Sequence, residues 1–439
     1  MKKNPQQYDG MGGGMGPGGP GGARGRFNQF INIRTFRSLK NTAFRFYWGA
    51  ALCQMASMNM QMVARSYLIY DVYDSEAILG YMALCNAGPM IFLSLYGGVI
   101  ADRLPKKFVM IAGQLVSAVV SLAIAFVLMS GYINADNPGS WWVLAVAAFF
   151  QGTVMGLMMP ARQAMVPEIV GQEQLLNALS LNTVGMSGMR FIAPAVGGFL
   201  IFAFDYAAVY FTMTGIYLLA VFLTTFLPSV RTTRIVNLQR NSALADIREG
   251  FRYLRHQKDI IFILVFTLIA VLLSMPYMIL MPVFAKDILQ VGASGYGVLM
   301  SVSGIGAIIG AVTLASLPNK KRGLLLLISS LVIGCSLASF AFSTSWPLSL
   351  GLMVIVGLGT TGRMTLGNTL IQYYVEDEYR GRVMSIYMME FGLTSFSAFI
   401  AAQVSETIGV QWVIGGLAMV LAFISLLALL FVGRIRRLD

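Results

Sequence analysis

Long apolar stretches, separated by short polar connections, occupy most of this sequence. A helix that crosses a bilayer needs about 20 apolar residues, and each of these stretches reaches that length. The pattern predicts an all-α integral membrane protein with twelve transmembrane helices, and this even number places both chain ends on one side. The predicted spans are 44–70, 77–101, 107–131, 140–164, 174–200, 206–229, 259–285, 293–317, 323–344, 347–374, 382–406 and 410–433.

The longest polar segment inside the chain, residues 231–258, separates six spans from the other six. The sequence thus predicts two six-helix bundles joined by a linker. Within the linker, Leu244, Ile247, Phe251 and Leu254 recur at helical spacing, which is typical of an amphipathic helix on a membrane surface. We favour a mechanical linker over a regulatory partner site. The predicted organisation is a Gly-rich disordered tail (1–40), an N-terminal bundle (41–229), the linker (230–258), a C-terminal bundle (259–433) and a second tail (434–439).

Composition and charge agree with a membrane protein. The chain is 57% hydrophobic and 11% charged, too few charged residues to cover a water-soluble surface. Lys and Arg gather before the first span, in the linker and after spans two, eight, ten and twelve, whereas the opposite loops hold only Lys286. Because cytoplasmic loops carry the positive excess, both termini are expected in the cytoplasm. The net charge of +12 then reflects topology and contact with an anionic inner leaflet, not nucleic-acid binding.

Motifs of enzymes and metal sites are missing from the sequence. The single histidine, His256, falls in the linker, and there is no His-x-x-Glu-His, paired Asp cluster or Cys-x-x-Cys. Cys53, Cys85 and Cys335 lie in apolar spans, so structural disulfides are not expected. The first residues lack the continuous apolar stretch of a cleavable signal peptide. We expect no enzymatic activity and no bound metal.

Residues 97–107 form a short charged connection between the second and third spans. Its length requires a tight antiparallel hairpin with its charges at the lipid headgroups. The segment resembles the signature loop of the major facilitator superfamily of transporters, Gly-x-x-x-Asp-Arg-x-x-Arg/Lys-Lys/Arg. The matching residues are Gly98, Asp102, Arg103, Lys106 and Lys107, while Pro105 replaces the usual glycine.

The fifth span contains a second resemblance to that superfamily. Its segment 190–198 is similar to the Gly-Pro-x-x-Gly-Gly motif associated with exporters, because Pro194, Gly197 and Gly198 match while Ala193 replaces the first glycine. Proline removes a backbone donor, so a helix bend is expected here. The alternative is a packing kink without bearing on transport direction.

Wider segments, among them 176–182 and 380–385, resemble the facilitator branch that contains the enterobactin exporter. The resemblance implies a secondary active exporter of the bacterial inner membrane that works by alternating access and needs no cofactor. It also implies proton coupling and a small-molecule substrate, either drug-like or a siderophore, and we expect a monomer. An importer or lysolipid transporter of the same fold is the main alternative, and a non-transporting receptor or scaffold is a weaker one.

Ionisable residues inside spans are costly and are therefore candidates for function. Four of them, Arg65, Arg190, Arg363 and Glu390, lie away from the predicted loop ends. Glu390 is the one clear carboxylate well inside a span, so it is the candidate carrier of a coupling proton. A structural ion pair with Arg363 or another arginine is the alternative. For Arg190 the alternative is packing, and for Arg65 it is a side chain that reaches the outer interface.

Charges on the predicted cytoplasmic face suggest a gate between the bundles. Ion pairs there could hold the bundles together and separate when the cavity opens inward. Solvated loop charges, worth ~0 to 1 kcal/mol each, are the alternative. The candidate gating residues are Gly98, Asp102, Arg103, Lys106, Lys107, Glu168 and Arg382.

Methionine and tyrosine are abundant near the middle of several spans, for example Met55 and Met58 in the first and Met281 in the seventh. Flexible thioethers suit a cavity for large, partly apolar ligands, although most of these side chains are expected to pack or face lipid. Pro276 and Pro282 are expected to break the seventh helix.

Overall fold

The computed structural model describes residues 38–103, 105–228, 252–255, 257–318, 320–376, 378–436 and 438, without the side chains at 94–103, 172, 173 and 391. Helices make up most of this part of the chain, and no strand occurs within it. Most of the linker, including three of the four residues of the predicted amphipathic face, lies outside the described residues, as does His256.

Helices α2 to α6 form the N-terminal half. The first begins after Asn41, whose side chain accepts hydrogen bonds from the Ala43 and Phe44 N–H groups. Gly171 divides α5 into two spans, because its φ of 68° suits glycine and interrupts the helical backbone. The elements are α2 (Thr42–Tyr73), α3 (Glu76–Arg103), α4 (Lys106–Met129), the short 3-10 helix η2 (Pro138–Trp141), α5 (Trp142–Ala203) and α6 (Tyr206–Thr225).

The C-terminal half starts with a broken span. Helix α8 ends at Ser274 and α9 begins at Tyr277, so the predicted break at Pro276 is confirmed. At Pro282 the chain stays helical, but the α-helical winding ends one residue later, at Val283, where a π-helical turn begins. The elements are α8 (Lys258–Ser274), α9 (Tyr277–Val283), the π-helical turn η3 (Phe284–Ile288), α10 (Gly292–Ser316), α11 (Arg322–Ala341), α12 (Trp346–Tyr374), α13 (Arg380–Ile408), α14 (Val410–Phe431) and α15 (Gly433–Arg436).

Eleven segments of the described residues are long and apolar enough to cross a membrane. One further long helix, α2, carries Gln54, Asn59, Gln61 and Arg65 and is too polar to count among them. It nevertheless packs along α5 and α6 as a full member of the N-terminal half. With α2 included, the described chain has the all-α architecture of twelve spans that the sequence predicts.

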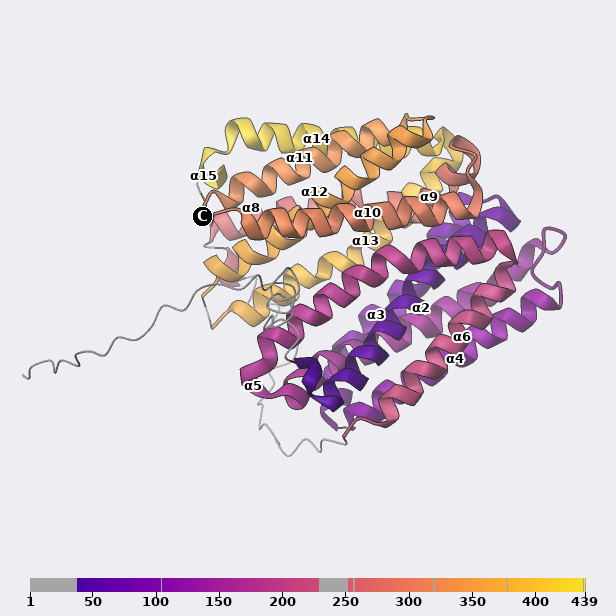
Figure 1. Ribbon diagram of the computed structural model, residues 1–439. Helices are drawn as coiled ribbons and strands as arrows, with labels where there is room; N and C mark the ends of the chain where they lie inside the picture. The colour runs from indigo at the N-terminus through magenta and orange to yellow at the C-terminus, as the bar shows by residue number, and fades with distance from the viewer. Residues whose placement is uncertain are drawn as a thin grey trace, which may run out of the picture.

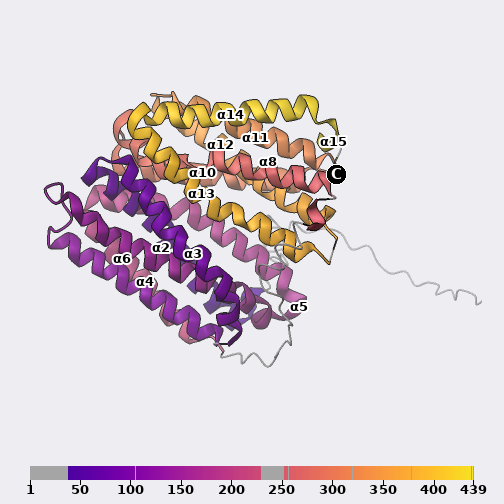
Figure 2. The same cartoon turned by 180° about the vertical axis from the view of Figure 1, so that it is seen from behind.

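The spans are arranged as two adjacent bundles. Figures 1 and 2 show the N-terminal helices, indigo to magenta, packed together below the C-terminal helices, orange to yellow. Across the boundary, α3 packs against α13 and α5 packs against α10. These two crossings are the most extensive contacts between the halves, and smaller ones join α9 to α2 and α3.

Glycines bring α5 and α10 into backbone contact. A Cβ added at Gly198 would lie 2.5 Å from the Ala293 carbonyl oxygen, and one added at Gly297 would lie 2.5 Å from the Pro194 carbonyl oxygen. Side chains larger than hydrogen do not fit between these backbones. The close crossing thus depends on glycine at both positions.

The two ends of the molecule differ in charge. We call the end that carries Lys106, Lys258, Arg322 and Arg434 the basic end, and it lies on the left in Figure 1, next to the C label. The other end, which we call the acidic end, carries Asp71, Asp74, Glu76, Asp287 and Glu406 at the ends of helices and in the turns between them. This asymmetry follows the distribution of Lys and Arg between the loops.

Candidate functional site

A cavity of about 420 Å³, which we call the central cavity, lies between the two bundles. Helices α2 and α5 of the N-terminal bundle and α10 and α12 of the C-terminal bundle contribute its walls. Its volume falls within the range of about 300–1,000 Å³ that is typical of small-molecule sites. The lining residues are Gln54, Met55, Met58, Asn59, Met155, Met158, Met159, Arg162, Thr183, Met186, Ser187, Arg190, Gly304, Ala307, Ala311, Thr361, Met364 and Thr365.

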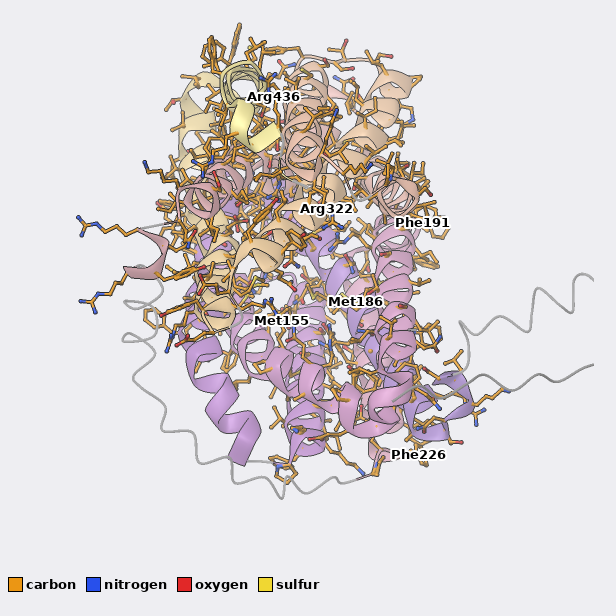
Figure 3. All side chains as sticks on the ribbon, turned by 90° about the vertical axis from the view of Figure 1, so that its left-hand side faces the viewer. Met155, Met186, Phe191, Phe226, Arg322 and Arg436 are labelled. Carbon is orange, nitrogen blue, oxygen red and sulfur yellow. The ribbon has the colours of Figure 1, made fainter. Side chains whose placement is uncertain are left out.

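The central cavity lies in the half of the boundary nearer the basic end. Arg162 is nine residues before Gly171, where α5 turns at the basic end, and Thr365 is nine residues before the end of α12 at Tyr374. At 1.5 Å per residue, each lies about 13 Å from that end. Figure 3, which looks onto the basic end, places Met155 and Met186 near the boundary between the bundles.

Thioethers, small polar groups and two guanidinium groups make up the wall of the cavity. Seven of its residues are methionines, which adapt to ligands of different shape. Met55 and Met58 line it as their position suggested, whereas Met60 and Met281 are buried in the hydrophobic core. Arg190, a candidate from the sequence, lines the cavity together with Arg162.

Arg65 lies at the bundle boundary outside this lining. Its guanidinium is within electrostatic range of the Tyr210 hydroxyl on α6 and the Tyr296 hydroxyl on α10, so it faces both bundles. The Tyr210 hydroxyl is buried and lacks a hydrogen-bond partner among the described residues.

Arg363 and Glu390 come together between α12 and α13. Arg363 Nη1 lies 3.8 Å from Glu390 Oε2, and the two residues are only 2% and 6% exposed. Glu390 lines a second cavity of about 460 Å³ between α8 and α13, not the central one. The ion pair considered from sequence is thus present, while a role for Glu390 in coupling stays a prediction.

Lys286 joins the bundles at the acidic end. Its Nζ lies 3.6 Å from an Asp71 carboxylate oxygen and 3.5 Å from one of Asp74, both at the end of α2. The same ammonium group lies 5.3 Å from the centroid of the Tyr70 ring, whose hydroxyl donates a hydrogen bond to Asp287. Two charged residues of η3 therefore bind the last turn of α2 and the residue that follows it.

A second set of polar contacts joins α3 and α13 at the same end. Glu406 Oε1 accepts hydrogen bonds from the Ser75 hydroxyl at 2.5 Å and from the Ala77 N–H at 2.9 Å. The Ser405 hydroxyl donates to Glu76. We refer to these hydrogen bonds and to those of Lys286 and Asp287 as the acidic-end contacts.

Sequence reasoning missed the acidic-end contacts, although one signal for them was visible. Lys286 is the only Lys or Arg in the loops of that side, surrounded by the carboxylates of several turns. A single cation among several acids has its partners nearby once the loops converge. What the sequence did not reveal is that the partners lie more than two hundred residues away.

Three of the predicted gating residues, Lys106, Lys107 and Glu168, make contacts within the N-terminal bundle. Lys106 forms an ion pair with Glu168, and Lys107 Nζ donates to the carbonyls of Thr225 and Leu227 at 2.6 and 2.7 Å. The Arg382 guanidinium lies 5.5 Å from the Tyr379 ring centroid and has a further interaction. The side chains of Gly98, Asp102 and Arg103 lie outside the described residues, so the proposed gate stays a prediction.

The helix-bend motif lies at the bundle boundary. Gly197 faces Met60 of α2, and Gly198 faces α10. The backbone of α5 remains helical through Pro194, because Gly171 is the residue of α5 with non-helical dihedral angles. This segment provides the close crossing with α10, and its bearing on transport direction stays a prediction.

Comparison with known proteins gives concordant matches over nearly the whole chain. A family model described as transmembrane secretion effector matches residues 33–438. The staphyloferrin A transporter of Staphylococcus aureus is 23% identical over 83% of this chain and 90% of that relative. The multidrug efflux pump Tap of Mycolicibacterium fortuitum is 25% identical over 89% of this chain and 95% of the pump. The enterobactin exporter of Shigella boydii is 26% identical over 79% and 80% of the two chains.

Solved structures agree on the fold. The nucleoside transporter NupG superposes with a TM-score of 0.68 at 13% identity, over 90% of this chain and 98% of that one. A D-xylose–proton symporter gives a TM-score of 0.67 at 12% identity, over 88% and 97% of the two chains. At these identities the likeness concerns the arrangement of helices alone.

Proposed function

Because this chain belongs to the transmembrane secretion effector family of the major facilitator superfamily, we propose that it exports a small, partly apolar molecule by alternating access. Family membership makes it a multi-pass membrane transporter and not an enzyme. Siderophores and drugs are named in the descriptions of several relatives, which supports an exported substrate of one of these two classes.

One observation carries the proposal. Both bundles line the central cavity, and the acidic-end contacts join the two bundles on one side of it. Alternating access needs a site that both halves share and contacts that form on one side while the other side opens. The central cavity supplies the first, and the acidic-end contacts supply the second. In this arrangement the substrate enters from the basic end, and separation of the acidic-end contacts releases it on the other side.

The basic end is proposed to face the cytoplasm of a bacterial cell, with both termini on that side. The positive-inside rule supports this orientation, because Lys and Arg near the spans are concentrated at that end. Substrate would then enter from the cytoplasm, as export requires. A monomer suffices for this cycle, since both walls of the cavity belong to one chain.

Proton coupling is the second part of the proposal, and Glu390 is its candidate carrier. A proton on Glu390 would remove the negative partner of Arg363, which lies next to the cavity residue Met364 on α12. A buried carboxylate inside a span is expensive when ionised, so loss of its charge is a plausible response to an incoming proton. Protonation of Glu390 could thus shift Arg363 and, with it, the part of α12 that lines the central cavity.

Transport in inverted membrane vesicles tests the function. Vesicles from cells that produce the chain present the cytoplasmic face outward, and acidifying their interior imposes the gradient that a proton-coupled exporter uses. A panel of macrolides and siderophores should include a compound that accumulates inside these vesicles and not in vesicles from cells without the chain. Accumulation only in right-side-out vesicles would instead indicate an importer, and absence of flux in both would remove the transport proposal.

A further inference from the structure

The central cavity has an unbalanced charge. Arg162 lies in the first span of α5 and Arg190 in the second, and both line the cavity. None of the described lining residues is Asp or Glu. Neither guanidinium forms an ion pair with a described carboxylate, in contrast to Arg363, which has Glu390. The wall therefore carries two positive charges and no negative one within the described part of the chain.

No ion pair with a described residue neutralises these charges. The Tyr277 hydroxyl lies within electrostatic range of Arg190, and the Tyr47 hydroxyl lies within range of Arg162. The Tyr47 hydroxyl donates to the Arg162 carbonyl oxygen at 3.0 Å, a contact that leaves the guanidinium free. An unpaired guanidinium at membrane depth is costly, and it is retained mainly where it faces a pathway or a ligand.

The two arginines also restrict which chemical groups a ligand of the cavity can carry. Its planar guanidinium donates two parallel hydrogen bonds to a carboxylate, sulfonate or phosphate, which a cationic or purely apolar ligand cannot accept in that way. The remaining wall is rich in methionine and suits a large apolar body. A ligand that matches both parts is amphipathic and anionic.

Two further cavities of the described chain differ in this respect. The cavity between α8 and α13 contains both Arg255 and Glu390, and a cavity of about 580 Å³ between α3 and α13 is lined by no Lys, Arg, Asp or Glu. Neither of these two cavities has the two unpaired arginines of the central cavity. We infer that the central cavity selects amphipathic anions, with Arg162 and Arg190 binding the acidic group and the methionines surrounding the apolar part. This inference rests on the proposed transport function, since it names the substrate class of that site.

Three dansyl probes with a common aromatic body but different charge test the inference. Dansylglycine is anionic, dansylamide is neutral and dansylcadaverine is cationic. Their binding is measured by fluorescence anisotropy on the purified protein in phosphatidylcholine nanodiscs, with empty nanodiscs as the blank. Dansylglycine should bind at least about tenfold more tightly than dansylcadaverine, because a charge-assisted pair distinguishes the two. Equal affinity for the three probes, preference for the cation or absence of dansylglycine binding would overturn the inference.

Arginine variants connect the charge preference to the cavity. Arg190→Gln and Arg162→Gln should each weaken dansylglycine binding by about tenfold while dansylamide binding changes less than about twofold. Arg190→Lys should recover part of the affinity, because it keeps the charge and loses the two-pronged geometry. Arg322→Gln is the matched control, since Arg322 lies over the Tyr373 ring at the basic end and does not line the cavity. Thermal unfolding of each variant verifies folding, and a loss shared equally by all three probes would argue against anion recognition.

An anionic lipid headgroup carries the same chemistry as a soluble anion. Binding is therefore repeated in nanodiscs that contain phosphatidylglycerol, and displacement of dansylglycine by this lipid would overturn a role in substrate selection. The binding and transport experiments test the inference and the proposed export function separately. Cation-selective binding with intact vesicle transport would refute the inference alone, whereas anion-selective binding without any transport would refute export alone.

Discussion

The Glu406 carboxylate at the end of α13 accepts a hydrogen bond from the Ala77 N–H at 2.9 Å, so one bundle caps the first turn of α3 in the other. The Ser75 hydroxyl donates to the same oxygen at 2.5 Å. Helix N-termini leave N–H groups without partners in their own helix, and a side-chain cap contributes about 1 kcal/mol. When the bundles separate at the acidic end, α3 loses this cap. The conformation of the bundles is therefore linked to the stability of a helix end.

Glu406→Ala should favour opening of the acidic end. Loss of about 1 kcal/mol from the closed arrangement shifts the equilibrium roughly fivefold toward the open one. A cysteine placed at Ala402, which is buried at the α3–α13 crossing, reports this shift in a background that lacks the three native cysteines. Its rate of reaction with N-ethylmaleimide should rise by about the same factor. Glu378→Ala, an exposed carboxylate at the basic end, is the control, and equal rates in both variants would contradict a role for the cap.

Glu390→Gln should abolish uphill export driven by a pH gradient and leave downhill substrate exchange measurable. The amide cannot exchange a proton, but it keeps the size of the side chain and a hydrogen-bonding group near Arg363. Flux in proteoliposomes with and without the gradient separates the two modes. A variant that still concentrates substrate with unchanged pH dependence would show that Glu390 has no part in coupling.

Stability measurements test the alternative that Arg363 and Glu390 form a structural ion pair. Arg363→Met should destabilise the folded protein by ~3 to 5 kcal/mol, because it leaves the Glu390 carboxylate buried without its partner. The double variant Arg363→Met with Glu390→Leu should recover much of this loss, since no buried charge remains. Thermal unfolding in detergent gives the comparison, and equal destabilisation in the single and double variants would exclude the ion pair as its cause.

Asp102→Asn should impair transport far more than folding. The substitution removes a charge from the loop that resembles the facilitator signature and leaves the side-chain volume almost unchanged. Expression and thermal unfolding should stay near those of the unmodified protein while flux in reconstituted vesicles falls. Unchanged flux at matched protein amount would remove Asp102 from the mechanism.

A cysteine introduced at Ser242, in the linker, should not react with an impermeant thiol reagent in intact cells. The linker is expected in the cytoplasm because Lys and Arg are concentrated on its side of the membrane. Permeabilised cells provide the positive control, and the three native cysteines are replaced beforehand. Labelling in intact cells would reverse the proposed orientation and the direction of transport with it.

The helices were predictable because each depends on local sequence. Apolar length defines eleven of the spans, Asn41 caps the first helix and Gly171 separates the fourth span from the fifth. At Pro282 the helix is not broken but changes from α-helical to π-helical winding after Val283, which the sequence pattern did not specify. Local physics therefore determines where the helices begin and end.

The site depended on tertiary packing and was predictable only in part. Arg190 was recognised as a charge inside a span, but its position on the cavity wall follows from how α5 is rotated against α2 and α10. Arg162 reaches the same cavity wall from the other span of α5, and this placement likewise follows from packing. Tyr70 and Asp287 are 217 residues apart in sequence, and nothing local to either one specifies the other.

Seven thioethers make the central cavity a site of redox sensitivity. Met159 and Met364 are 44% and 42% exposed, so oxidants that reach the cavity meet accessible sulfur atoms. Each sulfoxide replaces a flexible apolar contact by a polar, chiral S=O group that accepts hydrogen bonds. Oxidation would thus change which molecules fit the wall of the cavity, and methionine sulfoxide reductases would restore the original surface.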